Sequence, residues 1–171
     1  MKSNLLELKA SLRSLTQARC KVKGLGAHLQ GTYRQVDTYF NVHEGRLKLR
    51  EVDDEPTSQL VYYDREDLPG LKESDIVLLE TDDPGTLKTI LERALGVKVI
   101  VTKLREIYRY QGTQIHLDEV EDLGTFIEFE RRITDLPQDR RVLEELMDVL
   151  GIRPGDLVKG SYSDLKMNVG R

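Results

Sequence analysis

The sequence has few of the features that indicate an extracellular or membrane protein. It contains one cysteine, Cys20, so no internal disulfide can form, which is typical of a reducing compartment. No apolar run is long enough to span a bilayer. The first residues lead directly into a strand pattern without the apolar segment of a signal peptide. We therefore expect a soluble, cytoplasmic protein with no membrane partner, in which Cys20 is a small packing residue within a helix.

The sequence also lacks the marks of several functional classes. It has 26 Lys and Arg against 30 Asp and Glu, a formal net charge of −4, whereas general nucleic-acid binders carry an overall basic excess. No phosphate-binding glycine loop is present, because Gly24-Leu25-Gly26 is too short and instead indicates the end of a helix. Repeats, low-complexity tracts and Ser/Gly linkers are absent from the sequence. At 171 residues the chain is expected to form one domain, residues 1–171.

The alternation of apolar and polar residues predicts eight strands and three helices. Strands are expected at 5–10, 32–42, 46–52, 58–66, 74–80, 98–110, 114–120 and 125–133, and helices at 14–25, 83–95 and 135–150, followed by a short tail at 160–166. Tight turns join most neighbouring strands, which predicts a largely antiparallel sheet. Many such strands with one polar face favour a closed barrel without exposed edges. The expected fold class is α+β, a closed eight-stranded antiparallel barrel with a charged interior and helices packed on the outside.

Positively charged side chains recur in the strand segments, often two positions apart and therefore on the same face of a strand. The cations in question are Lys9, Lys48, Arg50, Arg65, Lys103 and Arg105. Lysine and arginine are natural donors to phosphate oxygens, and crowding them together is costly unless an anion accompanies them. Any one pair is also consistent with a solvated sheet face. Taken together, and with acids in the same stripes, the set favours an interior that binds a highly anionic ligand.

Negatively charged side chains occupy the same kind of position. The acids are Glu7, Asp118, Glu128 and Glu130. Hard carboxylate oxygens suit Mg²⁺ or Mn²⁺, which makes these residues candidate metal ligands. The alternative is that they only neutralise the cations in salt bridges. Asp118 is chosen over its neighbour Glu119 because Ile115 and Leu117 place Glu119 on the apolar face, and His116 lies on the same face as Asp118.

In this order and spacing, the motifs of the chain resemble those of a known family. They are Glu7-Leu8-Lys9, Asp37-Thr38-Tyr39-Phe40, Arg46 to Arg50, Tyr62 to Arg65, Lys103-Leu104-Arg105, Leu117 to Val120, Leu123-Gly124, Ile127 to Glu130 and Ser161 to Leu165. The first resembles the ExExK signature of CYTH-domain proteins, within the triphosphate tunnel metalloenzyme superfamily. The others resemble its class IV adenylyl-cyclase-like branch. The resemblance covers nearly the whole chain.

The resemblance implies an eight-stranded tunnel that binds a triphosphate together with Mg²⁺ or Mn²⁺. By motif position the six cations would hold the phosphates and the four acids would hold metal, with Lys9, Arg105 and Glu130 as the catalytic residues. The implied ligands are small triphosphates: ATP, thiamine triphosphate or tripolyphosphate. The implied reaction is conversion of ATP to cyclic AMP and pyrophosphate, with triphosphate hydrolysis as the alternative.

One residue departs from the family signature. Leu5 stands where ExExK has its first glutamate, so the expected ligand set is one carboxylate short. This keeps open a third alternative, a protein that binds a nucleotide or polyphosphate without turning it over. The oligomeric state is also left open between monomer and homodimer.

Overall fold

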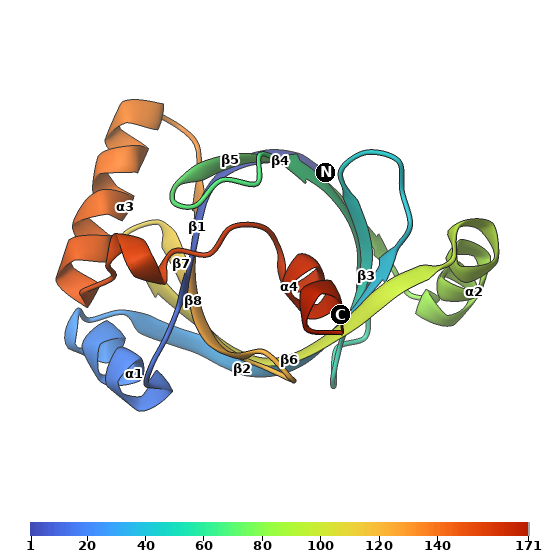
Figure 1. Ribbon diagram of the computed structural model, residues 1–171, viewed down its shortest axis with the longest axis horizontal. Helices are drawn as coiled ribbons and strands as arrows, with labels where there is room; N and C mark the ends of the chain where they lie inside the picture. Colours follow the sequence, from blue (N-terminus) through green and yellow to red (C-terminus); the bar gives the residue numbers. More distant parts are fainter. Residues whose placement is uncertain (171) are drawn as a thin grey trace.

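The computed structural model describes residues 1–170 and contains a closed barrel (Figure 1). Its strands are β1 (Lys2–Ser11), β2 (His28–Phe40), β3 (Arg46–Val52), β4 (Ser58–Arg65), β5 (Lys72–Thr81), β6 (Val97–Tyr110), β7 (Thr113–Val120) and β8 (Gly124–Arg132). Around the barrel they run in the order β1-β5-β4-β3-β2-β6-β7-β8, and each pair of neighbours is antiparallel. The predicted fold class is confirmed.

Alternation along β1 shows how the sequence makes two unlike faces. Leu6, Leu8 and Ala10 are buried in an apolar core on the outside of the barrel, whereas Glu7 and Lys9 line its interior. The period of two in a strand requires this division. The interior is not charged all round, however, because β4 and β5 line it with Val61, Ile76 and Leu78.

Two helices cover the outer apolar face of the barrel. In α1 (Leu15–Gly24) and α3 (Leu136–Leu150), the residues Ala18, Val22, Leu143, Leu146 and Leu150 pack against β1, β7 and β8. Each helix begins at a side-chain cap, Ser14 for α1 and Asp135 for α3, which accepts a backbone N–H of the first turn. These contacts fix the strands that carry the predicted acids.

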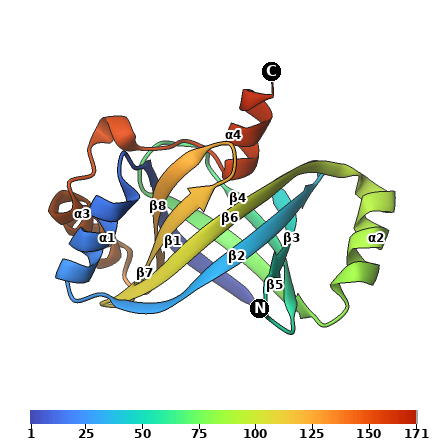
Figure 2. The same cartoon turned by 90° about the horizontal axis from the view of Figure 1, so that it is seen from below.

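The helix α2 (Pro84–Leu95) lies beside the barrel on the far side from α1 and α3 (Figures 1 and 2). It has no buried residue, and Asp83 caps its N-terminus as the sequence predicts. None of the helices formed by residues 1–170 combines the length and the apolar character needed to cross a membrane.

The tail predicted at 160–166 is in fact helical. After a short 3₁₀ turn at Pro154–Asp156, a fourth helix, α4 (Tyr162–Val169), lies over one end of the barrel (Figures 1 and 2). Ser161 and Asp164 form a capping box that starts it. The prediction for Cys20 is also wrong, because its side chain is exposed on α1 rather than packed. The positions facing the core on that helix are Ala18 and Val22.

Candidate functional site

The barrel encloses a cavity of about 610 Å³, hereafter the barrel cavity. Nine of the ten residues singled out in the sequence line it: Lys9, Lys48, Arg50, Arg65, Lys103, Arg105, Glu7, Glu128 and Glu130. Ser161 and Tyr162, both buried, line it at the end where α4 lies. The opposite end reaches solvent, since the lining there includes exposed Met1 and Glu55. The cavity is therefore a charged pocket entered from the end away from α4.

The basic wall of the cavity is organised around one buried carboxylate, Asp37 of β2, which is 1% exposed. Arg50 donates to both of its oxygens at 2.8 Å, and the Nζ atoms of Lys103 and Lys48 lie 2.8 and 3.1 Å from Oδ2. Burial would raise the pKa of Asp37, but Arg50, Lys103 and Lys48 hold it well below its ordinary value. One acid thus holds three cations side by side.

The lysines of this wall are held at an electrostatic cost. Burial, with Arg50 next to it, lowers the pKa of Lys48 to about 8, and burial lowers the pKa of Lys103 well below its ordinary value despite Asp37. Burial also lowers the pKa of Lys9. An anionic ligand near these groups would favour their charged forms, so the wall is suited to bind one.

Asp37 was not among the site residues predicted from sequence, although it lies within the quoted motif Asp37-Thr38-Tyr39-Phe40. A signal was present, because Asp37 shares the strand face of Gln35 and Tyr39, and those two residues line the cavity. Three more cations near the cavity were missed: Arg109 and Arg132 line it, and buried Lys72 faces Glu7 across β1 and β5.

A second charged cluster joins β6, β7, β8 and α4. Arg105 donates to both oxygens of Asp118, at 2.7 and 2.6 Å, and to Glu128 at 3.0 Å. The hydroxyl of Tyr162 donates to Asp118 at 2.6 Å, and Lys9 sits 3.5 Å from the centre of the Tyr162 ring. Lys9 also pairs with Glu128 at 3.0 Å. The start of α4 is therefore part of the cavity wall.

The structure brings Asp118 into this cluster but not to the cavity surface. It is fully buried behind Arg105, and both of its oxygens accept hydrogen bonds. Burial opposes its ionisation, but Arg105 lowers the pKa of Asp118 below its ordinary value. In this arrangement Asp118 orients Arg105, and its predicted role as a metal ligand is not the one its contacts favour.

Glu7 and Arg65 form an ion pair between β1 and β4, and Arg65 also donates to the carbonyl of Gly160 just before α4. Burial raises the pKa of Glu7 although Arg65 opposes this, and the nearby Glu130 and Glu128 add to the rise. Three carboxylates thus share one side of the cavity. Their mutual repulsion would be relieved by a cation among them.

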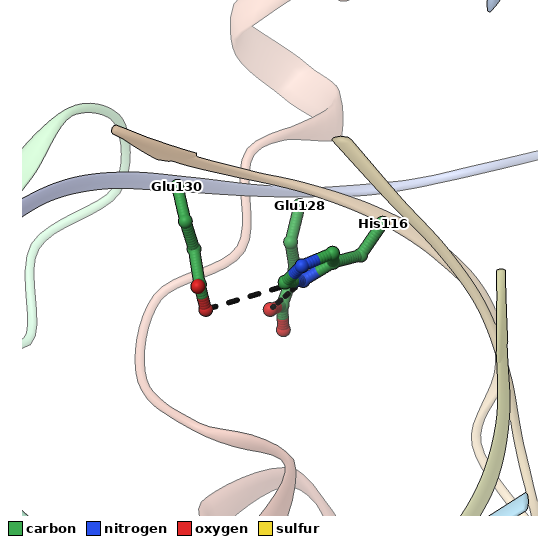
Figure 3. A group of neighbouring side chains, drawn as sticks. All are labelled: His116, Glu128 and Glu130. Carbon is green, nitrogen blue, oxygen red and sulfur yellow. Dashed lines mark ion pairs between the residues drawn. The ribbon is translucent and has the colours of Figure 1, made fainter. Parts of the chain in front are cut away.

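Three side chains on this side have the spacing of metal ligands (Figure 3). One ligand atom from each of His116, Glu128 and Glu130 can be chosen so that all lie within 4.8 Å of one another. Nδ1 of His116 is buried and has no hydrogen-bond partner among residues 1–170, which is unusual for a buried polar atom. The donor set and this unpartnered nitrogen fit a divalent cation. Leu5 also lines the cavity, two residues nearer the open end than Glu7, and offers no ligand atom.

A closed antiparallel barrel whose cavity is lined by cations, with carboxylates on one side, belongs to the class of barrel proteins that enclose an anion-binding site. The sequence matches the CYTH domain family model over residues 5–162, so the chain belongs to the CYTH domain family and the resemblance found in its motifs is confirmed.

Similar proteins come from archaea and from a plant. A Methanocaldococcus jannaschii protein named "Putative adenylate cyclase MJ0240" is 28% identical over 173 residues, covering 94% of this chain and 97% of its own. The structure of the PH1012 protein from Pyrococcus horikoshii OT3 superposes with a TM-score of 0.84 at 24% identity, covering 96% of this chain and 99% of that one. A Hippeastrum protein described as having a dominant triphosphatase activity has a TM-score of 0.69 at 18% identity, covering 98% of this chain and 96% of that one. At these identities the two structures show a common fold.

Proposed function

We propose that this protein is a divalent-metal-dependent enzyme that binds ATP in the barrel cavity and converts it to cyclic AMP and pyrophosphate. The observation that carries the proposal is the convergence of Lys9, Lys48, Arg50, Arg65, Lys103 and Arg105 on one cavity beside Glu128 and Glu130. Several phosphates are needed to match so many cations. The family and the name of the M. jannaschii relative support a nucleotide as the ligand.

The position of the charges suggests how a triphosphate would lie. Lys48 and Lys103 are on the wall that approaches the α4 end, where Arg46 at the start of β3 pairs with Asp164 of α4. The open end is lined by Met1, Leu5, Tyr33, Val52 and Ile107. We therefore place the terminal phosphates against the basic wall and the organic group at the open end, where apolar and aromatic surface can pack against a base.

In this arrangement the side chains act by position and charge. Lys48, Arg50 and Lys103 would hold the departing pyrophosphate, and Arg105, oriented by Asp118, would neutralise charge that develops as the ribose 3′-hydroxyl attacks the α-phosphorus. Glu128 and Glu130 would hold the divalent ion. When bound, that ion would supply positive charge to the phosphate oxygens and so reduce their electrostatic repulsion of the attacking oxygen.

Hydrolysis is the second candidate, because a cavity that reaches solvent admits water to the same phosphates. A substrate panel separates the candidates: ATP, tripolyphosphate and thiamine triphosphate, each with Mg²⁺ or Mn²⁺. Cyclic AMP with pyrophosphate supports the cyclase, and orthophosphate release supports a triphosphatase. Tight binding without product would mean a binding protein, as the loss of a carboxylate at Leu5 allows. Failure of all three compounds to bind would refute the proposal.

The cavity assignment is tested by two variants, Lys9→Ala and Arg105→Ala. Each removes a charged donor that faces the cavity, and we expect affinity for the triphosphate to fall by tenfold or more, about 1.4 kcal/mol. Lys23→Ala and Arg141→Ala, at exposed positions on α1 and α3, are the matched controls and should bind normally. Calorimetric titration measures the effect, and unchanged affinity in both cavity variants would contradict the assignment.

A further inference from the structure

The imidazole of His116 on β7 is held in one orientation by its neighbour two residues away. Its Nε2 lies 3.0 Å from Oε1 of Gln114, and since that oxygen can only accept, Nε2 carries the hydrogen. In the neutral imidazole Nδ1 is then left with a lone pair and no hydrogen. A metal-binding histidine characteristically donates its second N–H to an oxygen in this way, which fixes both the tautomer and the direction of the ring.

The lone pair of Nδ1 faces two carboxylates. Nδ1 lies 3.6 Å from Oε2 of Glu128 and 3.9 Å from Oε1 of Glu130 (Figure 3). Within the described part of the chain it makes no hydrogen bond. The His116 side chain is 3% exposed. A buried acceptor that faces two anionic acceptors is unfavourable until a cation lies between them. Metal–ligand bonds of about 2.0–2.2 Å would separate ligand atoms by up to roughly 4.4 Å, comparable with the 4.8 Å within which these three atoms lie.

We propose that Nδ1 of His116 is a metal ligand, and that with Glu128 and Glu130 it forms a centre that prefers Mn²⁺ to Mg²⁺. This rests on the proposed function only in that the ion would serve the bound triphosphate. Magnesium favours an all-oxygen shell, whereas first-row transition ions accept imidazole nitrogen readily. On β1, Leu5 supplies no carboxylate oxygen where the family signature has a glutamate. The nitrogen of His116 is therefore a larger fraction of the available ligand atoms than it would be with a glutamate at position 5.

The cations around Glu128 affect how tightly this centre would bind a metal ion. Lys9 pairs with its Oε1 and Arg105 with its Oε2, both at 3.0 Å, so these groups compete with a metal ion for the same carboxylate. Glu130 has the more exposed side chain of the two glutamates, 27% against 13%. A triphosphate that drew Lys9 and Arg105 toward its own oxygens would free Glu128 for the metal, so metal and triphosphate should each strengthen binding of the other.

Mn²⁺ alone is the probe, added to the full protein without substrate. Electron paramagnetic resonance of free Mn²⁺ gives its affinity, competition gives that of Mg²⁺, and electron spin-echo modulation detects a bound ¹⁴N nucleus. We expect ¹⁴N modulation in the wild type and affinity for Mn²⁺ at least about tenfold above that for Mg²⁺. His116→Gln should abolish the modulation and weaken Mn²⁺ binding by about tenfold or more. His28→Gln, at an exposed position at the start of β2, is the control.

Bound Mn²⁺ without ¹⁴N modulation, or His116→Gln with wild-type affinity for Mn²⁺, would overturn the inference. A proton on Nδ1 instead of a metal gives the first of these results. If the variant does not fold, the modulation in the wild type still decides. The result is separable from the proposed function: nitrogen-bound Mn²⁺ with no product from the substrate panel keeps this inference and refutes the enzyme, whereas product formation without ¹⁴N modulation does the reverse.

Discussion

At the scale of single residues, Asp37 shows how much of the site depends on one buried charge. It accepts hydrogen bonds from Lys48, Arg50 and Lys103 at once and so offsets part of their positive charge. Removing one partner of a buried ion pair leaves the others uncompensated, which is far more costly than losing an exposed pair. The carboxylate is therefore a structural requirement of the basic wall.

We expect Asp37→Asn to lower the free energy of unfolding by about 3–5 kcal/mol at pH 7. Because the folded pKa of Asp37 is depressed, its stabilisation is complete above its ordinary pKa of 3.8 and is lost as the pH falls through the folded value. The difference from the wild type should therefore shrink in acid. Urea unfolding at pH 7 and pH 3 measures both effects. Asp82→Asn, at an exposed position, is the control, and an equal effect of the two substitutions would contradict the prediction.

A second residue-scale prediction concerns Lys48, whose pKa burial lowers to about 8. A lysine carries its charge below its pKa, so the free protein loses the charge of Lys48 as the pH rises through 8. A bound phosphate would keep the proton on. Binding of tripolyphosphate should therefore take up protons near pH 8 and weaken above it. Calorimetry in two buffers of different ionisation enthalpy measures the uptake, and a Lys48→Met variant should show less. Equal heats in both buffers would refute this.

At the scale of elements, α4 contributes to the site although it was predicted only as a tail. Tyr162 at its start contacts Lys9 and Asp118, and the carbonyl of Gly160 accepts from Arg65. The helix is only eight residues long, so its apolar periodicity is too short to predict a helix. The pair Ser161 and Asp164, three apart, was the available signal because it is a capping box.

Truncation after Lys159 should leave a folded barrel, because the eight strands close on one another without α4. The shortened protein should bind tripolyphosphate at least about tenfold more weakly, since Lys9, Arg65 and Arg105 each lose a contact that orients them, directly or through Asp118. Circular dichroism reports the fold and calorimetry the affinity. Unchanged affinity after truncation would show that α4 does not shape the site.

The Tyr162→Phe variant keeps the ring and removes the hydrogen bond to Asp118. It should lower the free energy of unfolding by about 1 kcal/mol, which urea unfolding measures.

The other elements differ in how far the sequence determines them. The strands follow from local alternation: Glu7, Leu8 and Lys9 alone already separate an interior from an exterior face. Which interior residues meet depends on the order β3-β2-β6 around the barrel, and that order is not encoded within any one strand. This is why the sequence does not indicate Asp37, whose partners come from β3 and β6, or the contacts of Asp118 with Arg105 and Tyr162.

At the scale of the whole molecule, the overall charge and the charge of the cavity have opposite signs. The chain carries a formal net charge of −4, yet eight of its cations line one cavity of about 610 Å³. A large polyanion such as duplex DNA meets the outer surface and its net negative field, whereas a small triphosphate can enter the cavity. Size and shape, rather than net charge, should thus decide which anions bind.

We expect tripolyphosphate at about one hundred times its dissociation constant to stabilise the fold by about 2.7 kcal/mol, because only the folded chain assembles the cavity. For a chain of this size the rise in melting temperature would be about 5–10 °C. Duplex DNA at the same phosphate concentration should give no rise. Differential scanning fluorimetry measures both, and Lys9→Met, which removes a cavity cation, should show a smaller rise with tripolyphosphate. An equal shift with DNA would mean that the outer surface binds the anion, because a duplex is too wide to enter the barrel.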